Sequence, residues 1–213
     1  MPESKIGACP TAITTIPTVS CREIFGKAAK LIFQRAVSGN YFDETATETI
    51  DDADDWSGLF DAADDTKCVI TPEIENVVFG EQEQFTNGEN IHGAPIEIAL
   101  GAQPITIQIR NGSPSEKAAL SALRREDKLW VYVLDAGGNF LANLVSGSVG
   151  TDGVVSGINL SPRTFQVKDP TREGTQADEF MINLNFSLVP NWYDTAFFQA
   201  PEAGFNPLDL APS

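Results

Sequence analysis

Histidine and cysteine are scarce in this chain, which limits the chemistry it can carry. Its 213 residues include one histidine, His92, and three cysteines, Cys9, Cys21 and Cys68. An odd, sparse set of cysteines fits reduced thiols better than a disulfide framework, and a Cys9–Cys21 bridge formed on exposure to air stays an open alternative. Zinc sites need paired ligands at short spacings, so the sequence predicts small buried or half-buried thiols and no metal site.

Long apolar runs are also missing. No stretch approaches the roughly 20 apolar residues that a membrane helix needs. The first ten residues, MPESKIGACP, have no cationic start followed by an apolar run, as a signal peptide would. We therefore expect synthesis and residence in a cytosol. A hydrophobic content of 42% is still enough for a globular chain with a real core.

Motifs that carry catalysis are absent as well. The sequence has no G-x-S-x-G, no Walker loop and no strand-linked G-x-G-x-x-G. His92, in GENIHGAP, could build a Ser-His-Asp or Cys-His arrangement only around a loop. A glycosidase-like pair of carboxylates stays open, because thirty acidic residues offer many pairs. We expect no enzymatic activity and no cofactor.

Basic residues almost disappear between Asp43 and Glu97. This segment has sixteen acidic residues and one basic residue, Lys67, so it carries nearly all of the formal net charge of −16. It should repel phosphate backbones, which argues against nucleic-acid binding through it. Its most polar part, DETATETIDDADDWSGLFDAADDTK, lacks the spacing of a calcium loop. A solvated loop is the favoured interpretation, with calcium binding as the alternative.

Three apolar residues interrupt these acids at near-helical spacing. Trp56, Leu59 and Phe60 could anchor a short helix. The helix would pack either on the body of the protein or on a neighbouring copy.

After this polar loop the chain consists mainly of predicted β-strands. KCVITPEIENVVF predicts an edge strand or two short strands broken at Pro72, and PITIQIR alternates cleanly. KLWVYVLDAGGNFLANLVSG predicts a hairpin that turns over 135–139, and its first strand is apolar on both faces, so it should be central. GVVSGINL and RTFQVKD predict further strands, and DEFMINLNFSLVP alternates most regularly, from Phe180 to Leu188.

One segment predicts a strong helix, at about 114–125. Ser113 is the expected N-cap, Pro114 suits the first position, and Glu116 completes a capping box. Ala119, Leu120 and Leu123 form its apolar stripe. The predicted fold class is mainly β: an antiparallel β sandwich or barrel with one amphipathic α-helix and extended N- and C-terminal arms.

The chain divides into three parts on this interpretation. Residues 1–66 form an N-terminal arm and acidic loop region, 67–190 the β core, and 191–213 a proline-rich C-terminal tail. The tail keeps too many aromatic residues for a merely disordered segment: Trp192, Tyr193, Phe197, Phe198 and Phe205. It either wraps its own domain or docks on a neighbouring subunit.

Cations gather just before the acidic segment. CREIFGKAAKLIFQR, residues 21–35, contains four cations and a single acid. AKLIFQR predicts a short strand with Leu31 and Phe33 on one side and a mixed outer face on the other. These cations either neutralise acids of the same chain or belong to an arm strand that pairs with the next subunit. The candidate assembly residues are Lys27, Lys30, Arg35, Trp192, Tyr193, Phe197 and Phe198.

The order of elements resembles the tail tube (major tail) proteins of long-tailed bacteriophages. The resemblance covers mainly residues 67–190 and rests on VITPEIENVVFGEQEQF and SPSEKAALSALRREDKLWVYVLDAGGNF. It implies a virion structural protein whose copies form hexameric rings by joining their sheets into an inner barrel. Rings would stack through loops and terminal arms, with other virion proteins as partners. DNA would only pass through a typically negative lumen.

The same resemblance implies that the acidic segment lies toward the channel or at a contact between rings. Residues 1–66 depart from the family pattern, and this leaves room for other classes. One is a different virion component, such as a capsid-decorating, neck or tail-completion protein. Another is a calcium- or carbohydrate-binding β module.

Overall fold

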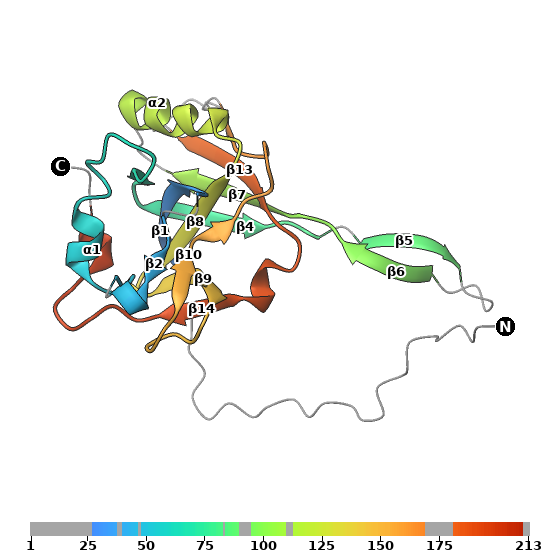
Figure 1. Cartoon of the computed structure of the whole chain (residues 1–213). Coiled ribbons are helices and arrows are strands. Elements are labelled where there is room, and N and C mark those ends of the chain that lie inside the picture. Colours follow the sequence, from blue (N-terminus) through green and yellow to red (C-terminus); the bar gives the residue numbers. More distant parts are fainter. Residues whose placement is uncertain are drawn as a thin grey trace.

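The computed structural model describes residues 27–37, 40–46, 48–82, 84–89, 95–109, 113–168 and 181–210. Antiparallel strands dominate it and form two main sheets and one hairpin (Figure 1). The mainly β, antiparallel fold class predicted from the sequence is confirmed.

The first sheet, called the large sheet, has the order β2-β10-β9-β8-β1-β3, with β11 also pairing β8 and β14 pairing β9. Its strands are β1 (Ala28–Arg35), β2 (Phe42–Asp43), β3 (Cys68–Ile70), β8 (Leu129–Asp135), β9 (Phe140–Ser146), β10 (Val154–Ser156), β11 (Ile158–Asn159) and β14 (Ala196–Gln199). The small sheet has the order β12-β13-β7-β4. Its strands are β4 (Ile74–Phe79), β7 (Gln103–Ile109), β12 (Gln166–Lys168) and β13 (Ile182–Leu188). The hairpin pairs β5 (Gln84–Glu89) with β6 (Pro95–Leu100).

An apolar core fills the space between the two sheets. In β7 and β13 the buried residues alternate with more accessible ones, as predicted, although Phe180 lies outside the described residues. Phe33 of the large sheet meets Phe165 and Phe186 edge to face, with ring centroids 5.1 and 5.7 Å apart. This inter-sheet core makes the molecule a β sandwich.

The other face of the large sheet carries a second core. Trp56 is fully buried there, with its ring stacked on Phe140 at 5.6 Å, and its Nε1 donates to the Ile50 carbonyl at 2.9 Å. Trp56 belongs to the short helix α1 (Ala53–Ser57), whose N-cap is Asp52. The helix expected around Trp56 is therefore present and packs on its own chain. Residues 43–66, the acidic layer, cover this face.

Strand β1 lies inside the large sheet, between β8 and β3. Residues 31–34 are all buried, so the mixed outer face predicted for this strand is wrong. The reason is that the second core covers that face, where Ile32 packs and the Gln34 amide donates to the Thr66 carbonyl at 3.0 Å. From residue 28 onward, the segment expected as an arm contributes strands to the body. Cys9, Cys21 and Arg22 lie outside the described residues.

The predicted helix and hairpin are both present. Helix α2 (Pro114–Ala122) continues into a 3-10 turn, Leu123–Arg125, and Ser113 and Glu116 form the capping box. Leu120 is buried and Leu123 half-buried, but Ala119 is exposed, so the apolar stripe is narrower than predicted. In the turn between β8 and β9, the buried Asp135 carboxylate accepts from the Asn139 backbone N–H at 2.8 Å.

Candidate assembly surface

The small sheet ends in two strands that are paired on one side only. Among the described residues, no strand pairs with the outer side of β4 or of β12. Uncovered edge strands offer free backbone donors and acceptors to another chain. The β4 edge also exposes two large apolar residues, Val78 at 51% and Phe79 at 50%. The β12 edge is short and polar, with Gln166 and Lys168 exposed.

The ribbon of β4 and β7 continues into the β5–β6 hairpin, which reaches away from the body (Figure 1). Two bonds hold the ribbon together at the transition: Gly80 N–H donates to the Pro104 carbonyl at 2.8 Å, and Gln82 Nε2 donates to the Gly101 carbonyl at 2.7 Å. A Cβ on Gly80 would lie 2.7 Å from Pro104 Cγ, so only glycine fits this close approach. The two strands of the ribbon are thus held together at the place where the ribbon leaves the sandwich.

An aromatic group lies at the base of this ribbon. Phe79 stacks on Trp192 at 6.4 Å, and Trp192 meets Tyr193 edge to face at 5.4 Å. Trp192 Nε1 donates to Gln103 Oε1 at 2.8 Å, which ties the aromatic group to β7. Tyr193 is 66% exposed. The structure therefore brings two predicted assembly residues, Trp192 and Tyr193, next to the β4 edge.

The other two tail aromatics lie elsewhere. Phe197 and Phe198 belong to β14, where they pair with Ala142 and Leu141 of β9. Both are half-buried, Phe198 against the inter-sheet core and Phe197 against the second core. In this structure the tail wraps its own domain, which was one of the two interpretations.

Residues 200–210, here called the strap, continue from β14 across the second core. Phe205 packs near Phe140, with ring centroids 6.3 Å apart. Lys30 Nζ donates to the Leu208 carbonyl at 2.6 Å and to the Leu210 carbonyl at 3.4 Å. The ammonium of Lys30 is thus hydrogen-bonded to the strap of its own chain.

Arg35 is also engaged within the chain. Its guanidinium bonds to Glu126 at 2.7 Å and to Asp65 of the acidic layer. The Glu126 carboxylate first, and Asp65 with it, raise the pKa of Arg35. Lys27 is exposed at the start of β1. Of the three cations predicted to act in assembly, Lys30 and Arg35 therefore make intramolecular contacts.

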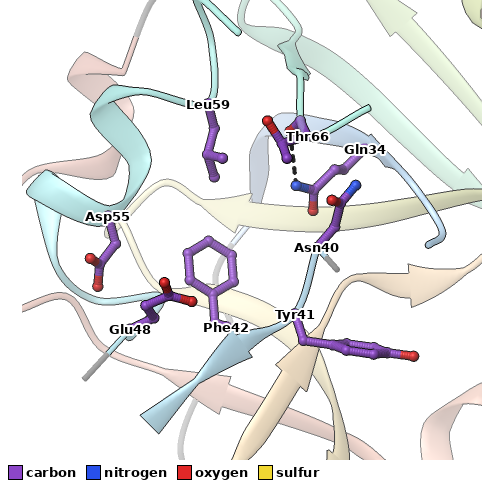
Figure 2. Close-up of a pocket in the computed structure, with 8 residues that line it drawn as sticks. All are labelled: Gln34, Asn40, Tyr41, Phe42, Glu48, Asp55, Leu59 and Thr66. Carbon is purple, nitrogen blue, oxygen red and sulfur yellow. Dashed lines mark hydrogen bonds between the residues drawn. The ribbon is translucent and has the colours of Figure 1, made fainter. Parts of the chain in front are cut away.

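A pocket of about 200 Å³ lies between the large sheet and the acidic layer (Figure 2). Three of its polar side chains have partners: Gln34 donates to Thr66, Asn40 Nδ2 donates to the Asp65 carbonyl at 2.7 Å, and Asp55 Oδ2 accepts from Thr49 N–H at 2.7 Å. The pocket is lined by Gln34, Asn40, Tyr41, Phe42, Glu48, Asp55, Leu59 and Thr66. The hydrogen bonds of Gln34 and Asn40 tie this part of the acidic layer to the body of the protein.

Several acids of the acidic layer cap turns. Hydrogen bonds from the Thr45 hydroxyl and backbone lower the pKa of Asp43, and Thr66 lowers the pKa of Asp64 in the same way. Across the part of the chain that the structure describes, no three His, Cys, Asp or Glu side chains gather closely enough to hold a metal ion. His92 lies outside that part. Burial raises the pKa of the Cys68 thiol to about 12.

No helix in the described ranges is long and apolar enough to cross a membrane. No family model matches the chain, and no curated protein matches it. A chain of the anti-feeding prophage baseplate, determined by cryo-EM with six-fold symmetry, aligns with a TM-score of 0.31 and 12% sequence identity. The alignment covers 89% of this chain and 100% of that chain. A TM-score this low carries no conclusion about fold or function.

Proposed function

We propose that this protein is the subunit of a phage tail tube, in which copies join the edges of their small sheets into a ring around a DNA channel. The observation that supports this most is that β4 and β12, among the described strands, are each paired on one side only. Neighbouring strands in the small sheet are all antiparallel, so β4 and β12 run in opposite directions. Placing β12 of one copy beside β4 of the next therefore continues the antiparallel order, and such head-to-tail contacts can close into a ring.

The chemistry of the two edges supports the same contact. Monomeric proteins usually protect an edge strand with charges, prolines or a covering element. The β4 edge instead exposes the apolar side chains of Val78 and Phe79. The chain also carries acids just outside β4, at Glu73 and Glu81, whereas β12 carries Lys168. Opposite charges at two edges favour their association and set which edges meet.

The β5–β6 hairpin supports stacking of rings. A two-stranded hairpin alone in water is marginally stable. Because β5 and β6 reach away from the sandwich (Figure 1), contact with another ring would supply the missing packing. On this proposal the protein is a non-enzymatic virion component made in the host cytoplasm. Its partners are its own copies and other virion proteins, and no cofactor is needed.

Two matched valine substitutions test the edge contact. Val78→Lys places a charge on the β4 edge, and Val145→Lys places it on β9 at a position that is also exposed, at 46%. Negative-stain electron microscopy at rising protein concentration should show rings or tubes for the wild type and for Val145→Lys. The Val78→Lys protein should remain a folded monomer, with the wild-type circular dichroism spectrum. A wild type that stays monomeric, or a Val78→Lys protein that assembles normally, would contradict the proposal.

The same two edge strands, β4 and β12, would also serve another virion component. A capsid-decorating, neck or tail-completion protein would use them with a different symmetry or without stacking. Closed trimers, or single rings that never stack, would favour this second function. Stacked rings of uniform diameter would favour the tail tube.

A further inference from the structure

The outer face of the small sheet carries two rows of side chains that run across all four strands, and all of them except Val78 are polar. In one row Gln166 faces Asn185, Asn185 faces Thr106, and Thr106 faces Val78. In the next row the aligned residues are Lys168, Asn183, Gln108 and Asn76. These two rows, here called the amide face, contain one charged side chain, Lys168, and no carboxylate.

The ammonium of Lys168 is hydrogen-bonded within the amide face. With its amide oxygen turned toward Lys168, Asn185 accepts from Nζ at 2.7 Å, and its nitrogen donates to Thr106 Oγ1 at 3.3 Å. The amide face therefore carries one cation per copy and no carboxylate, and it is internally hydrogen-bonded. A phosphate backbone meeting it would find little to attract it and little to repel it, because adhesion to nucleic acid grows with each cation that neutralises a phosphate.

The acidic layer lies on the opposite side of the sandwich. Residues 43–66 hold ten acidic residues, and they cover the face of the large sheet that points away from the small sheet. Both sheets thus separate the acids from the amide face. None of these ten acids is buried, so the salt solution around them, with a Debye length of about 8 Å, screens their field before it reaches the far side of two sheets packed about 10 Å apart. The acids of this layer therefore contribute little to the potential at the amide face.

We infer that the amide face lines the channel and meets the passing DNA, and that the acidic layer forms the outer wall of the ring. This inference rests on the proposed function, because only edge-to-edge joining of the small sheets turns their outer faces into a channel wall. It differs from the placement implied by the tail tube resemblance, which puts the acidic segment toward the channel or at a contact between rings. DNA slides, on this account, because the wall carries little charge and not because it is acidic.

Cysteine labelling of assembled protein tests the inference. Thr106→Cys marks the amide face and Ala53→Cys marks the acidic layer, and both positions are exposed in the single chain. Cys9 and Cys21 are replaced by serine, whereas Cys68 can stay because it is buried with a raised pKa of about 12, which keeps its thiol protonated. Each variant is labelled both as a monomer and as an assembled tube, with a maleimide attached to a bulky polymer. A small maleimide is the control that shows whether the cysteine is reactive.

We expect the bulky reagent to modify both cysteines in the monomer. In tubes it should modify Ala53→Cys fully and Thr106→Cys several-fold less, apart from open tube ends, while the small reagent still reaches both. Tubes in which Ala53→Cys is protected, or in which Thr106→Cys stays reactive toward the bulky reagent, would overturn the inference and leave the proposed function standing. If the wild type and both variants form no rings or tubes at any concentration, the proposed function itself fails, and the inference fails with it.

Discussion

The acidic layer and the amide face are both solvent-exposed surfaces, but they differ in backbone structure and in charge. The acidic layer has little regular structure, with one five-residue helix, and a few aromatic anchors such as Trp56 and Phe60 hold it on the large sheet. The amide face consists only of strand residues, which the alternation of the sheet turns outward. One surface is highly charged and the other nearly neutral.

The difference in charge arises from how side chains are spaced on the two surfaces. On a sheet face, residues directly opposite on neighbouring strands lie about 4.5–5.5 Å apart at Cβ, and like charges there are destabilising. Rows of carboxylates across four strands would add these repulsions at every pairing. In the acidic layer, side chains spread into water, and Asp43 and Asp64 cap turns through threonine two residues on. A loop layer can therefore carry charge that a sheet face cannot.

The largest expected effect comes from removing the main anchor of the acidic layer. Trp56→Ala deletes a fully buried indole and its bond to the Ile50 carbonyl. Replacing a buried tryptophan by alanine costs about 3–5 kcal/mol of unfolding free energy, which urea denaturation measures. Ser57→Ala, in the same helix but exposed, is the control and should change stability by less than about 0.5 kcal/mol. Equal losses in the two variants would mean that Trp56 does not anchor the layer.

A smaller effect is expected where the strap meets β1. Lys30→Met keeps the aliphatic stem but removes the ammonium that binds the Leu208 and Leu210 carbonyls. Hydrogen bonds to charged groups contribute about 1.5–3 kcal/mol, so thermal unfolding should shift clearly and proteases should cut the strap faster. Lys27→Met, at an exposed lysine of the same segment, is the matched control.

The same contacts revise the hypothesis that Lys30 and Arg35 belong to an arm strand. That hypothesis predicts that Lys30→Glu together with Arg35→Glu leaves folded monomers and blocks assembly. The structure predicts a less stable monomer instead, because both side chains bind groups of their own chain. If the double variant unfolds like the wild type but does not assemble, the arm-strand hypothesis would be supported instead.

Features set by local sequence could be predicted, and features set by distant partners could not. The alternation in β7, the capping box at Ser113 and the break at Pro72 depend on neighbouring residues, and all three are present. The faces of β1 depend on residues 42–60 and 205–210, which cover its second face from far along the chain. Gln34 is polar and still buried there, which its own position does not reveal.

The candidate site shows the same division. The aromatic content of the tail indicated that Trp192 and Tyr193 pack or bind, but not that they lie beside β4. Val78 and Phe79 escaped prediction because VVF is an ordinary strand sequence. Their exposure results from the place of β4 at the edge of the small sheet. The sequence predicts an edge strand here from Pro72, but the pairing that leaves Val78 and Phe79 open is long-range. A glycine directly after an apolar strand end, Gly80, was the available signal.

The smallest expected effect tests the comparison of the two surfaces directly. Asn183 and Gln108 lie opposite each other on the amide face. Asn183→Asp with Gln108→Glu creates a like-charge pair, whereas Asn183→Asp with Gln108→Lys creates an opposite-charge pair at the same two positions. A double-mutant cycle measured by urea unfolding should give a coupling of about 0.2–1 kcal/mol, unfavourable for the first pair and favourable for the second. If both couplings were zero, charge repulsion between strands could not explain why this face is neutral, and the channel would become the better explanation of its composition.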